Sequence, residues 1–385
     1  MCKKVLFVIK EMHMGGSRKS LCSLLNALSR NSKLKLYLLN MSSTGELLTE
    51  IPSSVMVLDV TANMKGYFAQ KNELSLSLLI RKAIFRLLYK LRLGDKILNY
   101  LIREWCKINR ITFDVVVGGQ EGISDEAALK IPGKKHIVWF HCDYDKYCTI
   151  VDETNKETEY SKADSIIFVS EKSRVAFSTK YPVLSDRCKV IKNIIDKNEI
   201  LNKAEQIPAY RFQGKEFRVV SVGRMSAEKG FDRILEIVKR LKAKNIDVEW
   251  VIIGGGALLE KYRARVREGK QDSIHFIGPT TNPYSIVKQA DLYVMTSHFE
   301  AQPLVLIEAL ILGIPVISTD FSSVREVISE TQKYGEVVEN SVNGIADCMA
   351  KLICEDKISE MKEAVRSFRY NNDDIIARVT EELLN

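Results

Sequence analysis

Short apolar runs alternate with helical patterns along the whole chain. Examples are VLFVI at 5–9 and FDVVVGG at 113–119 in the first half, and FRVVSVG at 217–223 and DLYVMTS at 291–297 in the second. Strands of a parallel sheet are buried on both faces, and each needs a crossover, usually a helix, to reach the next. The alternation predicts an α/β protein with two doubly wound, Rossmann-like sheets.

The length of the chain predicts two domains. With 385 residues, of which 46% are hydrophobic, it exceeds the size at which a single core keeps growing. Residues 196–216 are polar and irregular, as a linker is, which places the boundary near Pro208. We therefore predict domains at 1–207 and 208–367. A final helix at 368–385 can pack back on either domain, the first included.

The composition narrows the class of protein. No apolar run approaches the roughly 20 residues that cross a bilayer, and 5–9 is too short for a signal-peptide core, so a cytoplasmic protein is expected. The eight cysteines form no C-x-x-C pair, which argues against a zinc ribbon or a disulfide framework. A net charge of +8 favours an anionic partner without choosing among nucleotide phosphates, nucleic acid and a membrane face.

Two glutamates mark the most informative stretch, residues 297–319. A strand ends there, a loop carries Glu300, and a helix that begins near Pro303 carries Glu308. Open α/β sheets bind ligands at the carboxyl ends of their strands, and a helix N-terminus offers free N–H groups. A carboxylate on so apolar a helix needs a partner, and ribose hydroxyls would serve. An ordinary loop carboxylate and a half-exposed helix residue are the alternative.

Two cations follow the strand at 217–223. Arg224 and Lys229 lie on the loop at its carboxyl end. A departing nucleoside diphosphate develops negative charge, so fixed cations stabilise the transition state more than the ground state. Two solvated loop cations remain the alternative.

The first half offers two further candidates at strand ends. Gly15 and Gly16 lie between a strand and a helix, where the backbone can approach an anion closely; a plain turn capped by Ser17 or Ser20 is the alternative. His141 follows the strand HIVWF and could bond a donor or acceptor hydroxyl, unless it is a satisfied core histidine.

These motifs together resemble a known family. The spacing E-x-x-x-x-x-x-x-E, the string G-R-x-x-x-E-K-G at 223–230 and the turn and strand at 313–320 are similar to those of the retaining glycosyltransferase superfamily with the GT-B fold, the family 4-like or group 1 enzymes. The resemblance is strong over 217–327 and loose over 33–110. It implies that Glu300 holds sugar hydroxyls and Glu308 the ribose. It implies that Arg224 and Lys229 hold the diphosphate.

The same resemblance extends to weaker motifs. It implies that the loop with Gly15 and Gly16 faces donor and acceptor, and that His141 belongs to the catalytic site. Where family members commonly have glycine after the first glutamate, this chain has Ala301, which fits only if its φ is not strongly positive. The remaining residues expected to bind the donor are Gly254 and Gly255 in a glycine turn, Ile277 beside the nucleobase, and Gln302, Pro303 and Leu304 before the helix.

The function that the resemblance implies is a sugar transfer with retention. A hexose or N-acetylhexosamine passes from a nucleotide diphosphate sugar, with a UDP-sugar favoured, to a hydroxyl of a cell-envelope glycan or lipid-linked acceptor. No cofactor, metal or nucleic acid is expected, and the D-x-D triplet Asp143–Asp145 is interpreted as a loop. The alternatives are a nucleotide-sugar epimerase or phosphorylase on the same fold, or a non-catalytic nucleotide-sugar-binding scaffold.

A basic stretch at 78–110 mixes apolar and cationic residues at helical spacing with few acids. Such a helix can lie in the interface of an anionic membrane, which would place the protein at the inner face of the cell membrane. A helix pair that packs on the core with a solvated basic face is the alternative.

Overall fold

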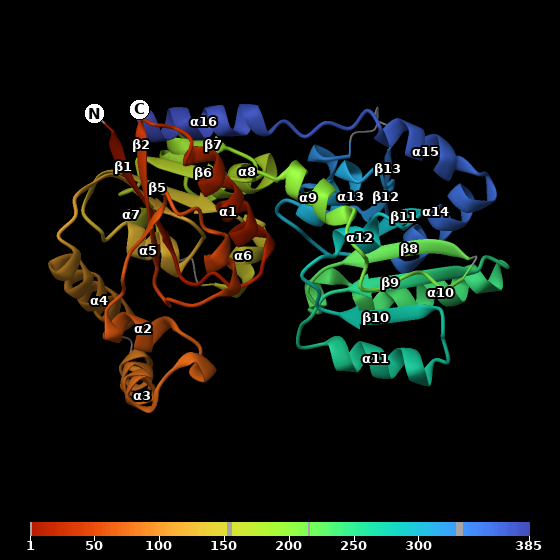
Figure 1. The fold of residues 1–385 in the computed structure, drawn as a ribbon, viewed down its shortest axis with the longest axis horizontal. Coiled ribbons are helices and arrows are strands. Elements are labelled where there is room, and N and C mark those ends of the chain that lie inside the picture. The colour runs from red at the N-terminus through yellow and green to blue at the C-terminus, as the bar shows by residue number, and fades with distance from the viewer. Residues whose placement is uncertain (1, 92, 152–155, 215, 329–333) are drawn as a thin grey trace. The chain divides into compact units, whose positions relative to one another are not determined.

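The computed structural model describes residues 2–91, 93–151, 156–214, 216–328 and 334–385. They form two compact units (Figure 1). The first contains the residues up to Ile194 together with Asn372–Asn385, and the second contains Ile195–Asn371. Each unit is built on its own parallel sheet, so the predicted α/β class with two Rossmann-like sheets is confirmed.

The first unit has a seven-stranded sheet in the order β3-β2-β1-β4-β5-β6-β7, with every neighbouring pair parallel. The order reverses between β1 and β4, the switch point where such sheets bind ligands. Its strands are β1 (Lys3–Ile9), β2 (Leu34–Asn40), β3 (Met56–Val57), β4 (Phe113–Gly118), β5 (Gly133–Phe140), β6 (Ser165–Phe168) and β7 (Cys188–Val190).

Helices pack against this sheet, and their apolar residues make its core. In α4, Leu98, Leu101 and Trp105 are buried with Leu6 and Val8 of β1. The helices of the unit are α1 (Gly16–Leu28), α2 (Ala62–Phe68), α3 (Leu76–Lys90), α4 (Gly94–Asn109), α5 (Ile123–Ala128), α6 (Tyr144–Ile150), α7 (Glu157–Tyr160), α8 (Glu171–Lys180) and α16 (Asn372–Leu384).

The second unit has a six-stranded parallel sheet in the order β10-β9-β8-β11-β12-β13. Its switch point lies between β8 and β11. The strands are β8 (Phe217–Val222), β9 (Val248–Ile253), β10 (Ile274–Gly278), β11 (Leu292–Met295), β12 (Val316–Thr319) and β13 (Gly335–Val338). The helices are α9 (Lys197–Ala204), α10 (Ile234–Ala243), α11 (Leu259–Glu268), α12 (Tyr284–Val287), α13 (Leu304–Ile311), α14 (Val342–Cys354) and α15 (Lys357–Val365).

The units divide between Ile194 and Ile195, earlier than the predicted boundary at 207/208. Part of the polar segment interpreted as a linker is the helix α9. Its Ile200 and Ala204 are buried, with Ile195, against Tyr284 and Ile307 of the second unit. A few apolar residues in a polar helix are enough to attach it to one core.

Helix α16 belongs to the first unit, where it contacts α1 (Figure 1). Its Glu382 is buried and accepts hydrogen bonds from Lys135, Lys189 and Ser165, at 2.6 Å for Lys135 and Ser165. The segment for which the periodicity left either domain open thus packs on the first unit. None of the helices in the described ranges has the length and apolarity needed to cross a membrane.

Candidate functional site

Two of the predicted residues meet at the switch point of the second sheet. Lys229, on the loop after β8, donates a hydrogen bond to Glu300, on the loop after β11, with Nζ and Oε1 2.5 Å apart. Ser297 Oγ donates to the same oxygen at 2.8 Å. Both charged side chains are mostly buried, with exposed fractions of 17% for Lys229 and 16% for Glu300. The pair is therefore held in place and is still accessible to a ligand.

Backbone contacts lock these two loops together. Thr296 Oγ1 donates to the carbonyl of Lys229 at 2.7 Å, and the His298 amide donates to the carbonyl of Glu228 at 2.7 Å. Gly230 has a φ of 63°, and a Cβ there would lie 2.2 Å from the Thr296 carbonyl oxygen. Only glycine fits this junction, which explains the end of the string at 223–230.

Arg224 lies at the start of the same loop and is exposed. The next residue, Met225, is fully buried, and its amide donates to the Gly255 carbonyl at 2.8 Å. This anchor fixes the backbone that carries the guanidinium while the side chain stays open to a ligand.

The glycine turn after β9 has a structural role that the sequence did not reveal. Gly254 has a φ of 141°, and a Cβ there would lie 1.9 Å from the Gly223 carbonyl oxygen. Gly255 has ordinary geometry, and its nearest neighbour would be Pro279 at 3.4 Å. The turn also joins the end of β10, where the half-buried Ile277 lies, because the Gly254 amide donates to the Gly278 carbonyl at 2.9 Å. Close approach of a donor to this turn stays a prediction.

Glu308 lies in the second turn of α13, which begins at Leu304 after Pro303, as predicted. Its Oε1 accepts a hydrogen bond from the Tyr284 hydroxyl of α12 at 3.1 Å. Gln302 donates to the Tyr370 hydroxyl at 2.8 Å. Sequence reasoning missed both tyrosines, because neither belongs to a motif.

Ala301 is buried, and its backbone φ is not positive, so alanine is accommodated here without strain. The departure from the glycine common in the family therefore leaves the loop geometry intact.

In the first unit, the glycine loop after β1 is held by its neighbours. Gly15 is the N-cap of α1 and no side chain caps the helix, so the alternative of a Ser17 or Ser20 cap is wrong. The Met14 amide donates to Glu46 at 3.1 Å, and His13 lies between Glu46 and Glu73, with each ring nitrogen 3.2 Å from a carboxylate oxygen.

His141 follows β5 at the carboxyl edge of the first sheet, with its Nδ1 shielded from solvent. Its ring stacks on Trp139 with centroids 5.6 Å apart. Burial lowers the pKa of His141 to about 4, although a hydrogen bond with Asn193 opposes the shift. The imidazole is therefore neutral near pH 7, so one of its nitrogens donates a hydrogen bond and the other accepts one.

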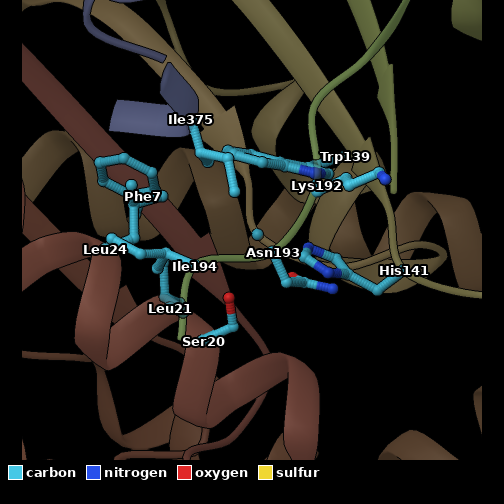
Figure 2. A pocket seen from close by; sticks show the side chains of 11 residues that line it. Phe7, Ser20, Leu21, Leu24, Trp139, His141, Lys192, Asn193, Ile194 and Ile375 are labelled. Carbon is cyan, nitrogen blue, oxygen red and sulfur yellow. The ribbon is translucent and has the colours of Figure 1, made fainter. Parts of the chain in front are cut away.

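Figure 2 shows His141 and Asn193 side by side at one end of a small pocket. The pocket has room for about one water molecule and none for a sugar.

Glu121, three residues after the end of β4, is a further residue that the sequence analysis missed. Its Oε2 accepts a hydrogen bond from the His141 amide at 2.8 Å, and burial raises its pKa. Its place beyond the apolar run at 113–119 was the signal that could have found it. The interpretation of the D-x-D triplet as a loop is wrong. Asp143 is the N-cap of α6 and accepts from the Lys146 amide at 3.2 Å, and Asp145 lies in the first turn of that helix, so the triplet begins a helix.

Two parallel sheets, each with a switch point in its strand order, define a doubly wound α/β protein, a class that binds ligands at such points. Residues 202–371 match the family model described as Glycosyl transferases group 1. Residues 202–371 therefore belong to that family, and they include Arg224, Lys229, Glu300 and Glu308.

Parts of the chain are also similar to curated proteins. An uncharacterized glycosyltransferase of Methanocaldococcus jannaschii is 29% identical over 165 residues, 42% of this chain and 41% of that protein. The Poly(ribitol-phosphate) alpha-N-acetylglucosaminyltransferase of Staphylococcus aureus is 26% identical over 201 residues, 52% of this chain and 38% of that protein. The chain thus matches about two fifths of the length of these curated relatives.

A solved structure covers the whole chain. The structure of HepE from Anabaena, in complex with UDP and glucose, aligns with 100% of both chains at a TM-score of 0.70 and 16% identity. This likeness establishes the GT-B fold.

Proposed function

We propose that the protein is a retaining glycosyltransferase that transfers a hexose or N-acetylhexosamine from a nucleotide diphosphate sugar. The observation that carries the proposal is the Lys229–Glu300 pair at the switch point of the second sheet, with Arg224 exposed on the same loop. This pair places an anion-binding group next to a group that binds hydroxyls, and a nucleotide sugar presents both a diphosphate and a sugar.

The positive charges of Arg224 and Lys229 complement the negative charge that develops on the leaving diphosphate. When the bond from the anomeric carbon to the donor phosphate breaks, the electron pair leaves with the diphosphate. Arg224 and Lys229 would stabilise that charge, Arg224 through its planar fork and Lys229 as a compact charge. Lys229 can turn to the phosphate because its partner Glu300 then gains a sugar hydroxyl as a hydrogen-bond donor.

Retention needs no protein nucleophile in this scheme. The leaving phosphate oxygen takes the proton of the acceptor hydroxyl on the same face of the sugar, so the protein mainly positions and stabilises. Glu308 would hold the ribose. Gly15, Gly16 and the neutral His141 would contact substrate at the edge of the first sheet. We propose that the reaction needs no metal, and we expect unchanged activity in EDTA.

The donor and acceptor follow from the comparisons by analogy. A UDP-sugar is favoured because the HepE structure contains UDP and glucose. A cell-envelope glycan or lipid-linked acceptor is favoured because the S. aureus relative is named for transfer to poly(ribitol-phosphate). We propose that the enzyme meets this acceptor at the inner face of the cell membrane.

The deciding experiment removes the two cations. Arg224→Ala with Lys229→Ala should lower kcat/KM for the UDP-sugar by roughly two orders of magnitude, which corresponds to ~3 kcal/mol of lost transition-state stabilisation. The matched control is Arg240→Ala with Lys244→Ala, which removes the same two residue types from surface ion pairs of the same unit. Full activity in the first variant would refute the proposal. Free epimerised sugar or phosphate-dependent cleavage without acceptor would favour the related reactions on this fold.

A further inference from the structure

Helix α3 presents an apolar stripe to solvent. None of its residues is buried, and the exposed fractions of Leu76, Ile80, Ile84 and Leu87 are 77%, 57%, 53% and 62%. These residues are spaced four, four and three apart, so they line one side of the helix. Single exposed apolar residues are normal on a protein surface, but a continuous stripe of them marks an interaction site.

The opposite side of α3 fixes the helix to the first unit. Phe85 packs edge-on against Tyr67, with centroids 5.4 Å apart. Lys82 Nζ donates to the carbonyls of Tyr67 at 3.0 Å and Ala69 at 2.6 Å. The helix is therefore attached to α2 (Figure 1). Phe85 and Lys82 lie on the side of the helix opposite the stripe, as their spacing from the stripe residues shows.

The neighbouring helix α4 is different, although the basic stretch at 78–110 includes it. Ile97, Leu101 and Trp105 of α4 are buried in the core of the first unit. Of the two interpretations given for the stretch, core packing thus holds for α4, and an open apolar face is found on α3.

The charges around the stripe are cationic. On a helical wheel Arg86 and Lys90 flank one side of the stripe and Arg81 the other, and all three are exposed. No acidic residue occurs between Glu73 and Asp95 in the sequence. An apolar stripe between cationic borders is complementary to the headgroup region of an anionic bilayer.

We propose that α3 lies in the surface of an anionic membrane, with Leu76, Ile80, Ile84 and Leu87 among the acyl chains and Arg81, Arg86 and Lys90 at the lipid phosphates. This inference rests on the proposed function in one respect: it supplies the surface on which a lipid-linked acceptor is met. The contact with lipid itself is independent of catalysis.

A tryptophan placed in the stripe reports insertion directly. The three native tryptophans are buried, so Leu87→Trp adds a single exposed indole. Vesicles that contain phosphatidylglycerol should shift its emission to the blue, and brominated lipid should quench it. Val183→Trp is the matched control, since Val183 is 73% exposed on another element, the 3-10 helix Pro182–Arg187. Its emission should not change.

Charge reversal tests the cationic border by co-sedimentation. Each basic residue near anionic lipid contributes ~1 kcal/mol, or about fivefold in binding, so Arg86→Glu with Lys90→Glu should bind such vesicles at least roughly 25-fold more weakly. Arg30→Glu with Lys33→Glu, an equal change of charge at exposed residues elsewhere in the first unit, should sediment almost as the unmodified protein does. About 1 M salt should also weaken binding, because it shortens the Debye length to about 3 Å.

Three outcomes would overturn the inference: no sedimentation with anionic vesicles, no loss in the Arg86/Lys90 variant, or a dimer in solution that Ile84→Ser with Leu87→Ser dissociates. The last result would assign the stripe to a second copy of the chain. Titration of each variant with UDP separates this test from the proposed function, because UDP binding should persist in all α3 variants even where vesicle binding is lost.

Discussion

Glu300 and Glu308 belong to one loop and helix, but different groups surround them. Lys229 and Ser297 contact Glu300, whereas Tyr284 contacts Glu308. The two glutamates of one motif therefore lie in different environments. This difference agrees with the two proposed roles, in which Glu300 binds the sugar and Glu308 binds the ribose.

Replacing each glutamate by glutamine should separate these roles. Glu308→Gln should weaken binding of UDP about tenfold, since a hydrogen bond to a charged group contributes ~1.5–3 kcal/mol. Glu300→Gln should leave UDP binding nearly unchanged and impair turnover of the UDP-sugar. Calorimetric titration with UDP and with donor measures both effects, and Glu236→Gln on α10 serves as the surface control. Equal affinities for all variants would reject the assignment.

His141 makes stability depend on pH. Because its pKa is lowered from 6.5 to about 4, the unfolded chain binds more protons than the folded protein between these values, and stability falls as the pH drops through that window. Between about pH 7 and about pH 5 the protein should lose roughly 1–2 kcal/mol more than His141→Gln does. Denaturant titrations at the two pH values measure this difference. Parallel pH dependence in the two proteins would show that His141 is not buried.

Several residues of the candidate site were predictable because their signal is local. Arg224, Lys229, Glu300 and Glu308 each follow a strand within one short string. Glu121 had such a signal, its place beyond an apolar run, but Tyr284 and Tyr370 did not, because each belongs to no motif and contacts its site residue from another element. A contact between residues far apart in the chain leaves no local pattern in a single sequence.

At the scale of elements, the glycine turn after β9 makes a strong test of loop packing. Gly254→Ala would combine an unfavourable φ with a clash against the Gly223 carbonyl, so it should destabilise the second unit by roughly 2 kcal/mol or more and weaken UDP binding. The adjacent Gly255→Ala should cost little stability, because its Cβ would meet only Pro279 at ordinary distance. Thermal unfolding and UDP titration compare the two variants. Loss of UDP binding in Gly255→Ala without loss of stability would instead indicate that a donor approaches this turn.

Elements were predictable where their periodicity was strong, as for the alternating strands and helices. The exceptions have a common cause. Helix α9 is polar, and its few apolar residues find their partners, Tyr284 and Ile307, some 80 to 100 positions later. Helices α3 and α4 both mix apolar and basic residues, and only the tertiary structure decides that the apolar face of α4 is covered and that of α3 is open.

At the scale of the whole molecule, Glu382 joins the two separate segments of the chain that make up the first unit. Burial alone would raise the pKa of Glu382, but hydrogen bonds from Lys135, Lys189 and Ser165 together lower it. Glu382→Gln should therefore destabilise the first unit by roughly 2–3 kcal/mol, because it leaves lysines beside a neutral group. Glu381→Gln, exposed on the same helix, should change stability by less than ~0.5 kcal/mol.

Hydrogen exchange can locate this effect. Faster exchange should appear in β5, β6 and β7 of the Glu382→Gln variant, while β8 to β13 keep their protection. Uniformly faster exchange in both sheets would contradict the assignment of α16 to the first unit alone.

The membership of α16 also sets the order in which the protein can mature on the ribosome. Residues 195–371 are contiguous, so the second unit has all of its chain before residues 372–385 have been translated. The first unit, although begun earlier, lacks until then the carboxylate for Lys135 and Lys189 and the apolar residues Ile375, Val379 and Leu383. The half of the chain that is synthesised first is thus the last to finish folding, and a nascent chain that stalls before residue 372 has a first unit without α16 and a second unit with all of its residues.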